Sequence, residues 1–397
     1  MAFFFFILYN IKRKKLISMK HIFIIGSRGY KAKYGGWETF VTKLVDNYDD
    51  ENTIFHISGL SDEKDKLENK IKDNIITDSF YIKQNGGLKM LLCTIKAFKY
   101  YLKHIKSNNV KNAYIYVLGL KLGPLLKLYK SKINKLGITI LVNPDGLEHE
   151  RSKWSYPVKK FFLLSEKWML FNCNIIVCDA KGIKKYIDSK YPSLRKKTIY
   201  IAYGTNKADL SRVNEKEVLE EYNLKKDNYL LMVGRFVPEN NYELVINEFM
   251  KSNINKKLVI ISNLSSSDYY KEVTMKTNCQ NDDRIQFING VYDEKKLSTI
   301  RKNAFAYIHG HSVGGTNPSL LEALSLTNLN ILYDVNFNKD VGKDSCVYFK
   351  NEGSLTKILD NIKDYDRKEL GKEAKKIIEE NFTWNIIVNK YKHIFRK

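Results

Sequence analysis

The segment Leu230-Leu231-Met232-Val233-Gly234-Arg235 decides the fold, because it restarts in mid-chain a pattern that the sequence has already used once. The first occurrence is Ile22-Phe23-Ile24-Ile25-Gly26, a short apolar run that ends at a glycine. Runs of this kind, separated by amphipathic stretches, indicate parallel strands that helices cover on both faces. The sequence therefore predicts an α/β protein of two Rossmann-like domains, joined near residue 205.

The apolar runs and the stretches between them give the expected elements. In the first half, strands are expected over residues 22–25, 53–57, 113–118, 138–142, 175–178 and 199–202, with helices from residue 39 and over 88–104 and 157–171. In the second half, strands are expected over 230–234, 258–262, 285–288, 306–309 and 330–333, with a helix over 318–326. A last helical stretch, 384–395, has no strand after it, and we expect it to pack back on the first domain.

The expected boundaries are a leader over residues 1–18, a first domain over 19–205, a second domain over 206–378 and a returning helix over 379–397. In the leader an apolar run, Phe3 to Leu8, is followed by a basic one. A signal peptide has the reverse order, with its positive charge before the apolar run, and ends at a small-residue cleavage site that the leader lacks. Two interpretations stay open. Either translation starts at Met19, or the leader is an aromatic and basic peg on a membrane surface.

Composition excludes several classes of protein. A chain of 397 residues is longer than one ordinary domain, and 44% hydrophobic residues can fill two cores. No apolar run reaches the roughly 20 residues of a membrane-spanning helix. The five cysteines are sparsely spread and include no CxxC pair. This pattern argues against a disulfide framework or a zinc module, and it indicates a reducing cytosol.

The positive charge is concentrated in the first half of the chain. The net charge of +23 divides into +20 for residues 1–200 and +3 for residues 201–397. A lysine-rich genome would raise both halves equally. The asymmetry therefore indicates that the first half faces something anionic, either a nucleic acid or a membrane surface.

Several common cofactor and catalytic motifs are absent from the sequence. The chain has no GxxxxGK[ST] phosphate loop, no HExxH and no GxSxG. The first glycine loop is Gly26-Ser27-Arg28-Gly29 rather than GxGxxG, which argues against a nicotinamide dehydrogenase. His309 and His311 have the spacing of a metal pair. Without a carboxylate or thiolate cluster nearby, they are more typical of packing or hydrogen bonding.

Glycine and polar residues follow strand ends in both halves. Gly35 and Gly36 open a helix, where paired glycines let a backbone approach a ligand and the helix N-terminus favours an anion. Residues 143–149, Asn-Pro-Asp-Gly-Leu-Glu-His, follow another strand and are predicted to bind a hydroxylated acceptor or to take part in a reaction. Arg235 ends the first strand of the second half, where its planar fork suits a phosphate. The alternative for Gly35 and Gly36 is a plain tight turn, the alternative for residues 143–149 is a solvated loop, and the alternative for Arg235 is a surface arginine.

The segment 309–324, His-Gly-His-Ser-Val-Gly-Gly-Thr-Asn-Pro-Ser-Leu-Leu-Glu-Ala-Leu, is the richest in signals. Paired glycines follow a strand, Thr316 or Asn317 can cap the next helix, and Pro318 suits its first turn. Free backbone N–H groups at such a place form a cradle for a diphosphate. Glu322 lies one turn inside the helix, where it can accept hydrogen bonds from ribose hydroxyls. The alternative is a capped helix with a purely structural role.

Together these motifs resemble retaining GT-B glycosyltransferases of family 4, over the chain from Met19 to its end. Three segments, 25–41, 143–154 and 314–319, resemble more narrowly the bacterial β-1,4-rhamnosyltransferases of capsule and cell-wall polysaccharide assembly. The resemblance implies the GT-B fold, in which two Rossmann-like domains face each other across a cleft. The first domain would bind the acceptor and the second the nucleotide sugar.

The resemblance also implies roles for individual residues. The donor-binding residues it implies are Gly35, Arg235, Gly314, Gly315, Thr316, Asn317 and Glu322, of which Arg235 neutralises the diphosphate and Glu322 holds the ribose. The residues it implies at the reaction centre and on the acceptor side are Gly36, Glu38, Asp145, Glu148 and His149. No protein nucleophile, metal ion or other cofactor is expected, because positioning and electrostatic stabilisation of the leaving nucleoside diphosphate supply the catalysis.

Three positions depart from the family pattern. Gly314 stands where the family has the first of two glutamates, eight residues before Glu322. Ser312 stands where the rhamnosyltransferase group often has an acidic residue, and Asn240 where a lysine is usual. Contacts to the sugar hydroxyls and to the diphosphate are therefore expected to differ from the family norm.

The function that the resemblance implies is retaining transfer of L-rhamnose from dTDP-L-rhamnose to a glucose on undecaprenyl diphosphate. The protein would be cytoplasmic and held on the inner face of the plasma membrane by its basic first domain. The alternatives are a UDP-hexose or GDP-mannose donor, a GT-B-like epimerase or phosphorylase, and a basic nucleic-acid-binding protein. A nucleic-acid partner is not expected, because a nucleic-acid-binding protein would not need the cleft of the second domain that contains Arg235 and Glu322.

Overall fold

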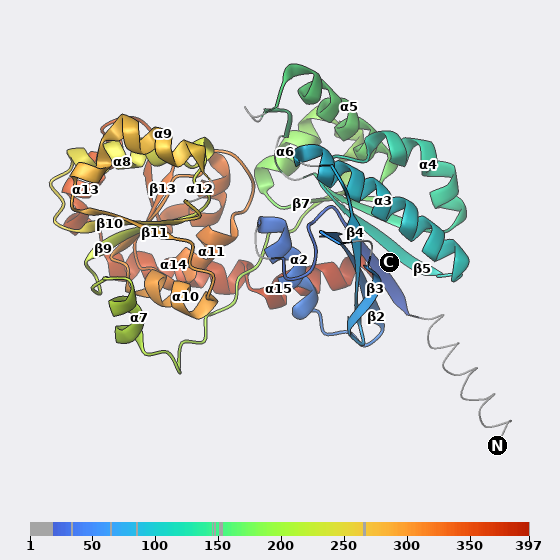
Figure 1. Ribbon diagram of the computed structural model, residues 1–397, viewed down its shortest axis with the longest axis horizontal. Coiled ribbons are helices and arrows are strands. Elements are labelled where there is room, and N and C mark those ends of the chain that lie inside the picture. The colour runs from blue at the N-terminus through green and yellow to red at the C-terminus, as the bar shows by residue number, and fades with distance from the viewer. Residues whose placement is uncertain are drawn as a thin grey trace. The chain divides into compact units, whose positions relative to one another are not determined.

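The computed structural model describes residues 19–32, 35–63, 66–84, 86–144, 146, 148–150, 154–264 and 267–396 (Figure 1). The expected leader over residues 1–18 and the expected catalytic residue Asp145 lie outside the described residues. So do Lys33, Tyr34, Leu147 and residues 151–153, which belong to the segments that carry the family resemblance. The chain divides into two compact units, Met1–Ala202 with Ile387–Lys397, and Tyr203–Ile386.

The first unit is built on an eight-stranded sheet with the strand order β3-β4-β2-β1-β5-β6-β7-β8. Its strands are β1 (Lys20–Ile25), β2 (Thr53–Ser61), β3 (Lys66–Lys72), β4 (Ile75–Tyr81), β5 (Asn112–Leu118), β6 (Thr139–Asn143), β7 (Ile175–Cys178) and β8 (Thr198–Tyr200). Every pair of neighbours is parallel except β3 and β4, which are antiparallel.

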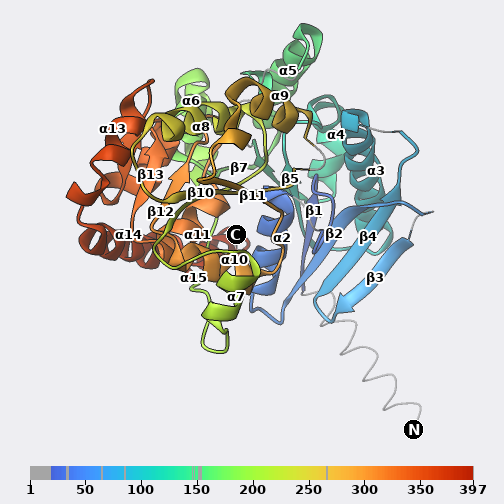
Figure 2. The same ribbon diagram turned by 60° about the vertical axis from the view of Figure 1, so that its left-hand side comes forward.

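The strands expected from the sequence omit β3 and β4 at the sheet edge, and β3 adds one antiparallel pair to a sheet that is otherwise parallel as expected (Figure 2). β3 reads Lys-Leu-Glu-Asn-Lys-Ile-Lys, so it lacks the apolar run that marks a buried strand. Lysine is common on edge strands because it discourages pairing with other chains. The expectation also missed β14 (Val347–Phe349) of the second unit, which is only three residues long.

Helices lie on both faces of the first sheet. One face carries α3 (Gly86–Ser107), α4 (Gly123–Lys135) and α5 (Tyr156–Asn172), and the other carries α2 (Gly36–Asp46) and the end of α15 (Trp384–Ile394) (Figure 1). The unit also contains α6 (Lys181–Lys190), η1 (Glu148–Glu150) and η2 (Pro192–Lys197). None of the helices in the described part of the chain has the length and apolar composition needed to cross a membrane.

The C-terminal helix α15 packs against the first sheet, as the sequence predicts. The hydroxyl of Tyr391 lies 2.8 Å from the hydroxyl of Tyr116 on β5. The hydroxyl of Tyr114, two residues earlier on the same strand face, donates to the carbonyl oxygen of Phe395 at 3.2 Å. All four rings are buried, so these hydrogen bonds satisfy hydroxyl groups that burial would otherwise leave without water.

Three histidines meet beneath α3. The Nδ1 atom of His21 on β1 lies 3.0 Å from the Nε2 atom of His56 on β2, and the His104 ring on α3 lies 5.3 Å from that of His56. Burial, and then the charge of His104, lowers the pKa of His21 to about 4. Burial also holds the pKa of His56 well below its ordinary value. The fold therefore requires both imidazoles to be neutral.

Acid is expected to destabilise the first unit through this cluster. Because the pKa of His21 is lower in the folded state, its contribution to stability is complete above about pH 6.5 and is lost as the pH falls through about 4. The shift corresponds to roughly 3 kcal/mol for His21 alone. Denaturant unfolding measured across this range checks it. His21→Leu should flatten the pH dependence, whereas His393→Asn, at an exposed position, should not; equal slopes would contradict the assignment.

The second unit is built on a six-stranded parallel sheet with the order β11-β10-β9-β12-β13-β14. Besides β14, its strands are β9 (Tyr229–Val233), β10 (Lys257–Ser262), β11 (Ile285–Asn289), β12 (Ala306–His309) and β13 (Asn330–Tyr333). Its helices are α7 (Glu215–Glu221), α8 (Tyr242–Lys251), α9 (Asp268–Thr277), α10 (Glu294–Asn303), α11 (Pro318–Leu326), α12 (Asn336–Gly342), α13 (Ser354–Asp360) and α14 (Arg367–Asn381), with 3-10 turns η3 (Pro238–Asn240), η4 (Cys279–Asn281), η5 (Lys343–Ser345) and η6 (Ile362–Asp364).

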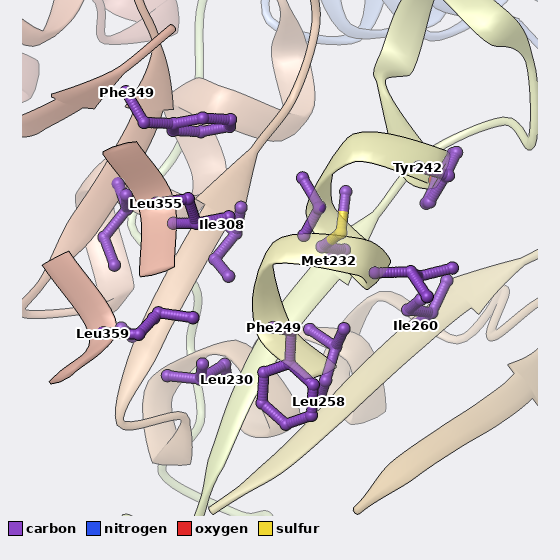
Figure 3. Close-up of a cluster of buried hydrophobic side chains, with 14 of the residues drawn as sticks. Leu230, Met232, Tyr242, Phe249, Leu258, Ile260, Ile308, Phe349, Leu355 and Leu359 are labelled. Carbon is purple, nitrogen blue, oxygen red and sulfur yellow. The ribbon is translucent and has the colours of Figure 1, made fainter. Parts of the chain in front are cut away.

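Alternate residues of the central strands fill two separate cores in this unit. Leu230 and Met232 of β9 pack with Phe249 of α8 and with α13 on one face of the sheet (Figure 3). Leu231, between them, packs on the other face with α7 and α10. The strands are apolar on both faces for this reason, and the sheet holds the ends of β9 and β12 in fixed positions.

Candidate functional site

In the first unit, the loop after β1 is held by the carboxylate of Glu38. The backbone N–H of Arg28 donates to Glu38 Oε1 at 2.8 Å. A Cβ on Gly35, where φ is +133°, would overlap Glu38 Oε2. Glu38 is buried in the first turn of α2, where the helix N-terminus favours its negative charge. The structure thus gives Glu38 a part in shaping the loop, and its catalytic role stays a prediction.

Gly36 lies at the start of α2, next to this loop. Among the described residues, a Cβ at Gly36 would meet no other atom within 4 Å, so they leave the backbone there open to a ligand. Gly35 and Gly36 therefore border the carboxyl end of β1, which is the place where ligands of parallel sheets bind. Gly35, which the sequence assigns to the donor, belongs to the first unit.

The other predicted residues of the first unit follow β6. Glu148 and His149 lie on η1, and Glu148 Oε2 accepts a hydrogen bond from Trp154 Nε1 at 2.9 Å. The Trp154 ring packs against Phe162 of α5, with 5.5 Å between the ring centroids. These contacts anchor η1 to the beginning of α5. They fix the position of His149 at the carboxyl edge of the sheet.

Glu166 is a polar residue beside His149 that sequence reasoning missed. It lies on the inner face of α5, and its Oε2 atom is 4.0 Å from His149 Nδ1. Its Oε1 atom accepts hydrogen bonds from Lys190 Nζ and Tyr191 OH, both at 2.9 Å. One signal was present in the sequence, since Glu166 is the only acidic residue of α5. Its buried carboxylate can orient the imidazole of His149.

In the second unit, Arg235 follows the end of β9 with an exposed side chain. Its guanidinium forms no ion pair with any residue that the structure describes. Burial, and then the charge of Arg235, lowers the pKa of His311 to about 3, so the imidazole next to Arg235 is neutral. Arg235 is therefore an exposed cation at a strand end that no described carboxylate neutralises.

Asn240, at the position where the resemblance led us to expect a lysine, has a structural role here. Its buried side chain donates through Nδ2 to the carbonyl oxygen of Arg235 at 2.7 Å. This hydrogen bond closes the loop that carries Arg235. The loss of the lysine thus leaves Arg235 as the cation of this loop, and the loop is held by a neutral amide.

His309 and His311 pack against each other. Their rings are stacked, with centroids 4.1 Å apart and an angle of 6° between the planes. Burial holds the pKa of His309 well below its ordinary value, so both rings are neutral. Within the described ranges, no three His, Cys, Asp or Glu side chains gather as metal ligands do. The packing interpretation of the two histidines fits this geometry.

Gly310 between these histidines brings two strand ends into close contact. Asn241 Nδ2 donates to its carbonyl oxygen at 2.7 Å, and a Cβ at Gly310 would overlap the carbonyl oxygen of Asn240. Gly310→Ala is therefore expected to destabilise the second unit by about 1–3 kcal/mol. Gly182→Ala in α6, where a Cβ meets nothing, serves as the control and should be neutral or stabilising. Denaturant unfolding compares them, and similar curves would rule out the close contact.

The loop before α11 has the geometry of an anion site. The N–H and the hydroxyl of Ser312 both donate to the carbonyl oxygen of Glu239, at 2.8 and 2.9 Å. Gly314 has a φ of +137°, which favours glycine, and a Cβ there would meet nothing within 4 Å. Neither Gly314 nor Gly315 donates its N–H to an acceptor in the described part of the chain. Such N–H groups bind anions when a helix N-terminus lies behind them.

Asn317 is the cap of α11. Its Oδ1 atom accepts a hydrogen bond from the N–H of Ser319 at 2.9 Å, while Thr316 is buried beside it. The sequence left the cap open between these two residues. The cap uses one N–H of the first turn, and the N–H groups of Gly314 and Gly315 stay available to a ligand.

Glu322 is held by Arg301, a second residue that sequence reasoning missed. Arg301 Nη1 lies 2.7 Å from Glu322 Oε2, and its Nη2 donates to the hydroxyl of Ser319 at 3.0 Å. The side chain of Arg301 is 3% exposed and that of Glu322 is 38% exposed. The pair therefore fixes Glu322 from behind and leaves part of its carboxylate in reach of a ligand.

Each half of the chain matches a different protein-family model. Residues 214–383 match the model of glycosyl transferases group 1, and residues 19–206 match a domain of unknown function, DUF1972. An uncharacterized glycosyltransferase of Methanocaldococcus jannaschii is 26% identical over 285 residues, which is 72% of this chain and 71% of the relative.

Solved structures share the fold over almost the whole chain. Sucrose-phosphate synthase from Thermosynechococcus elongatus has a TM-score of 0.73 at 16% identity, over 95% of this chain and 98% of the other. HepE from Anabaena, in complex with UDP and glucose, has a TM-score of 0.68 at 11% identity, over 95% of this chain and 99% of the other. At these identities the likeness shows a shared fold.

Proposed function

We propose that this chain, a glycosyltransferase of the GT-B fold whose second domain belongs to glycosyl transferases group 1, transfers a sugar from a nucleotide donor to a lipid-linked saccharide. The main support for a nucleotide-sugar donor is the anion site of the second unit. Arg235 has no ion-pair partner among the described residues, and the loop of Gly314 and Gly315 presents N–H groups in front of α11. A nucleoside diphosphate has the charge that such a site binds.

The donor is proposed to bind with its diphosphate on this site and its ribose on Glu322. Arg235 and the N–H groups of the loop stabilise the negative charge that grows on the diphosphate as the glycosidic bond breaks. We propose that these groups perform the task that a metal ion has in other sugar transferases. Glu322, fixed by Arg301, accepts hydrogen bonds from the ribose hydroxyls and so orients the donor.

The acceptor is proposed to bind to the first unit at the carboxyl ends of β1 and β6. Glu148 and His149 on η1, with Gly36 at the start of α2, supply the polar groups and the open backbone there. Support for His149 comes from Glu166, whose carboxylate lies 4.0 Å from its imidazole. Transfer with retention, through an oxocarbenium-like sugar and without a protein nucleophile, is part of this proposal.

For the donor, we propose dTDP-L-rhamnose, and for the acceptor a glucose on undecaprenyl diphosphate. The rhamnose proposal is supported by the segments that resemble β-1,4-rhamnosyltransferases. A glycine at position 314, where the family has a glutamate, is compatible with a sugar that offers fewer hydroxyls. A UDP-hexose is the second candidate, because the HepE structures contain UDP and UDP-glucose.

Transfer assays with dTDP-L-rhamnose, UDP-glucose, UDP-galactose and GDP-mannose on a synthetic lipid-diphosphate glucose acceptor test the donor proposal. A site built to bond the O6 hydroxyl discriminates against a 6-deoxy sugar, because its polar groups would be left unpaired. The proposal predicts rhamnosylated product and release of dTDP. Efficient use of a UDP-hexose without use of dTDP-L-rhamnose would contradict the rhamnose proposal and leave sugar transfer intact.

A lipid-linked acceptor places the enzyme at a membrane. We propose that the protein works in the cytoplasm, peripherally bound to the inner face of the plasma membrane, with nucleic acid excluded as a partner. The support is the charge of +20 on residues 1–200 against +3 on the remainder. Basic residues bind anionic lipid headgroups, and salt screens this attraction.

A further inference from the structure

One layer of helices in the first unit combines many lysines with almost no carboxylates. The helices α3, α4 and α5, which cover the same face of the sheet, contain twelve lysines between them (Figure 1). Their only acidic residue is Glu166, which is buried on the inner face of α5. The outer surface of this layer thus carries positive charge with no carboxylate from its own helices.

The outer surface of the same layer is also apolar. On α5, Tyr156, Leu163, Leu164 and Phe171 are exposed, while the opposite face packs inward through Phe162, Met169 and Leu170. On the neighbouring helix α4, Leu128 is 76% exposed. A helix that is apolar on both faces is normally buried on both. Within the described residues of the first unit, the outer side of α5 is therefore an exposed apolar surface.

Lysines alternate with these apolar side chains along α5. Lys160 and Lys167 lie on the exposed side at helical spacing from Tyr156, Leu164 and Phe171. The Lys160 ammonium lies 4.7 Å from the centre of the Tyr156 ring. We define the α4–α5 face as Leu128, Tyr156, Lys160, Leu163, Leu164, Lys167 and Phe171.

The mixture of side chains on this face points to lipid rather than to protein. Lysine is depleted at the centre of protein interfaces, where its charge would lose water without a partner. At a membrane surface, the lysine stems extend along apolar side chains, and the ammonium groups reach the phosphates of the headgroups. Tyrosine at the rim of such a face is typical of the boundary between headgroups and acyl chains.

The α4–α5 face is continuous with the proposed acceptor site. η1, which carries His149, directly precedes α5 in the chain and is tied to it by the hydrogen bond between Trp154 and Glu148. Tyr156, at the first turn of α5, is thus the end of the face nearest to η1. A saccharide attached to a lipid headgroup would reach η1 from a membrane that contacts α5.

We propose that the α4–α5 face inserts its apolar side chains into the headgroup region of an anionic membrane. The inference rests on the proposed function in one respect, since a lipid-linked acceptor explains why the enzyme would have such a face. It goes beyond charge alone, because it assigns part of the binding to Leu128, Tyr156 and their apolar neighbours. Salt should therefore weaken vesicle binding without abolishing it.

Vesicle co-sedimentation of the full chain with a matched pair of variants tests the proposal. The test variant is Leu128→Ser with Tyr156→Ser, whose side chains are 76% and 70% exposed. The control is Met275→Ser with Tyr292→Ser in the second unit, at 70% and 63% exposed. The vesicles contain phosphatidylcholine alone or with phosphatidylglycerol. We expect the test variant to bind the anionic vesicles at least roughly tenfold more weakly, and the control to bind like the unaltered chain.

Two further measurements separate the outcomes. Release of nucleoside diphosphate from the donor should be equal in both variants, because neither variant changes a residue of the proposed donor site. Equal vesicle binding by the two variants would overturn the proposal, although sugar transfer to a lipid-linked acceptor could still occur. So would a concentration-dependent dimer that the test variant alone disrupts, because the face would then be covered by a second copy. If the test variant loses vesicle binding but neither the unaltered chain nor either variant transfers sugar, the proposed function is wrong and the membrane role of the α4–α5 face is supported.

Discussion

Arg235→Ala is expected to lower the rate of sugar transfer by about ten- to over a hundredfold, because a charged hydrogen bond to a diphosphate is worth roughly 1.5–3 kcal/mol. The guanidinium has no ion-pair partner among the described residues, so its removal leaves no internal charge uncompensated. Folding stability should therefore stay close to that of the unaltered chain. The measurement is release of nucleoside diphosphate at a fixed acceptor concentration, together with denaturant unfolding.

Two control variants sharpen this experiment. Arg212→Ala removes an exposed arginine from the loop before α7 and should leave the transfer rate unchanged. Arg235→Lys keeps the charge but loses the planar fork, and should lie between the alanine variant and the unaltered enzyme. An unchanged transfer rate in Arg235→Ala would show that Arg235 does not bind the donor.

Glu322→Ala is expected to have two effects, on donor use and on stability. It removes the proposed acceptor of the ribose hydroxyls, which should raise the KM for the donor about tenfold. It also leaves the buried guanidinium of Arg301 without its carboxylate. Breaking a buried pair costs about 3–5 kcal/mol, and because Glu322 is 38% exposed we expect roughly 2 kcal/mol here.

A double variant separates the two roles of Glu322. Replacing Arg301 by methionine in the Glu322→Ala background removes the stranded cation, so unfolding stability should largely recover. The KM for the donor should stay high, because the ribose contact is still missing. If the double variant regains normal donor use as well as stability, Glu322 acts only through the fold and does not touch the ribose.

The central strands of the two sheets were predictable because a strand that is buried on both faces is a continuous run of apolar residues. The runs at β12 and β13 were expected at the residues where the structure has them. β3 has no such run, because an edge strand gains its hydrogen bonds from one neighbour and keeps its charged side chains in water. Its position depends on β4, which a scan for apolar runs does not reveal.

The supporting charges of the candidate site could not be predicted from local sequence. Arg301 is buried and Lys302, its neighbour on α10, is exposed, although both are basic residues near the end of the same helix. The difference arises because Arg301 faces α11, where its guanidinium pairs with the carboxylate of Glu322 and donates a hydrogen bond to the hydroxyl of Ser319. Such burial depends on how two helices pack, which the local pattern of either helix does not reveal.

Glu38 illustrates the same limit for a residue that the sequence did single out. Its place at a helix N-terminus after a glycine loop indicated a functional position. The hydrogen bond from Arg28 to its carboxylate depends on the path of the loop, which the residue pattern leaves open. Asn240 is similar, since its departure from the family lysine gave no hint that it would hold the backbone of Arg235.

Hydrogen–deuterium exchange with and without dTDP or UDP tests most directly whether the second unit binds a nucleoside diphosphate at the ends of β9 and β12. Bound nucleotide should slow exchange over residues 234–241 and 310–322, where the structure has Arg235 and the loop before α11. The protection should be lost in Arg235→Ala at the same nucleotide concentration. Saturating nucleotide that leaves both segments unprotected, or that protects other strand ends instead, would show that the donor site lies elsewhere.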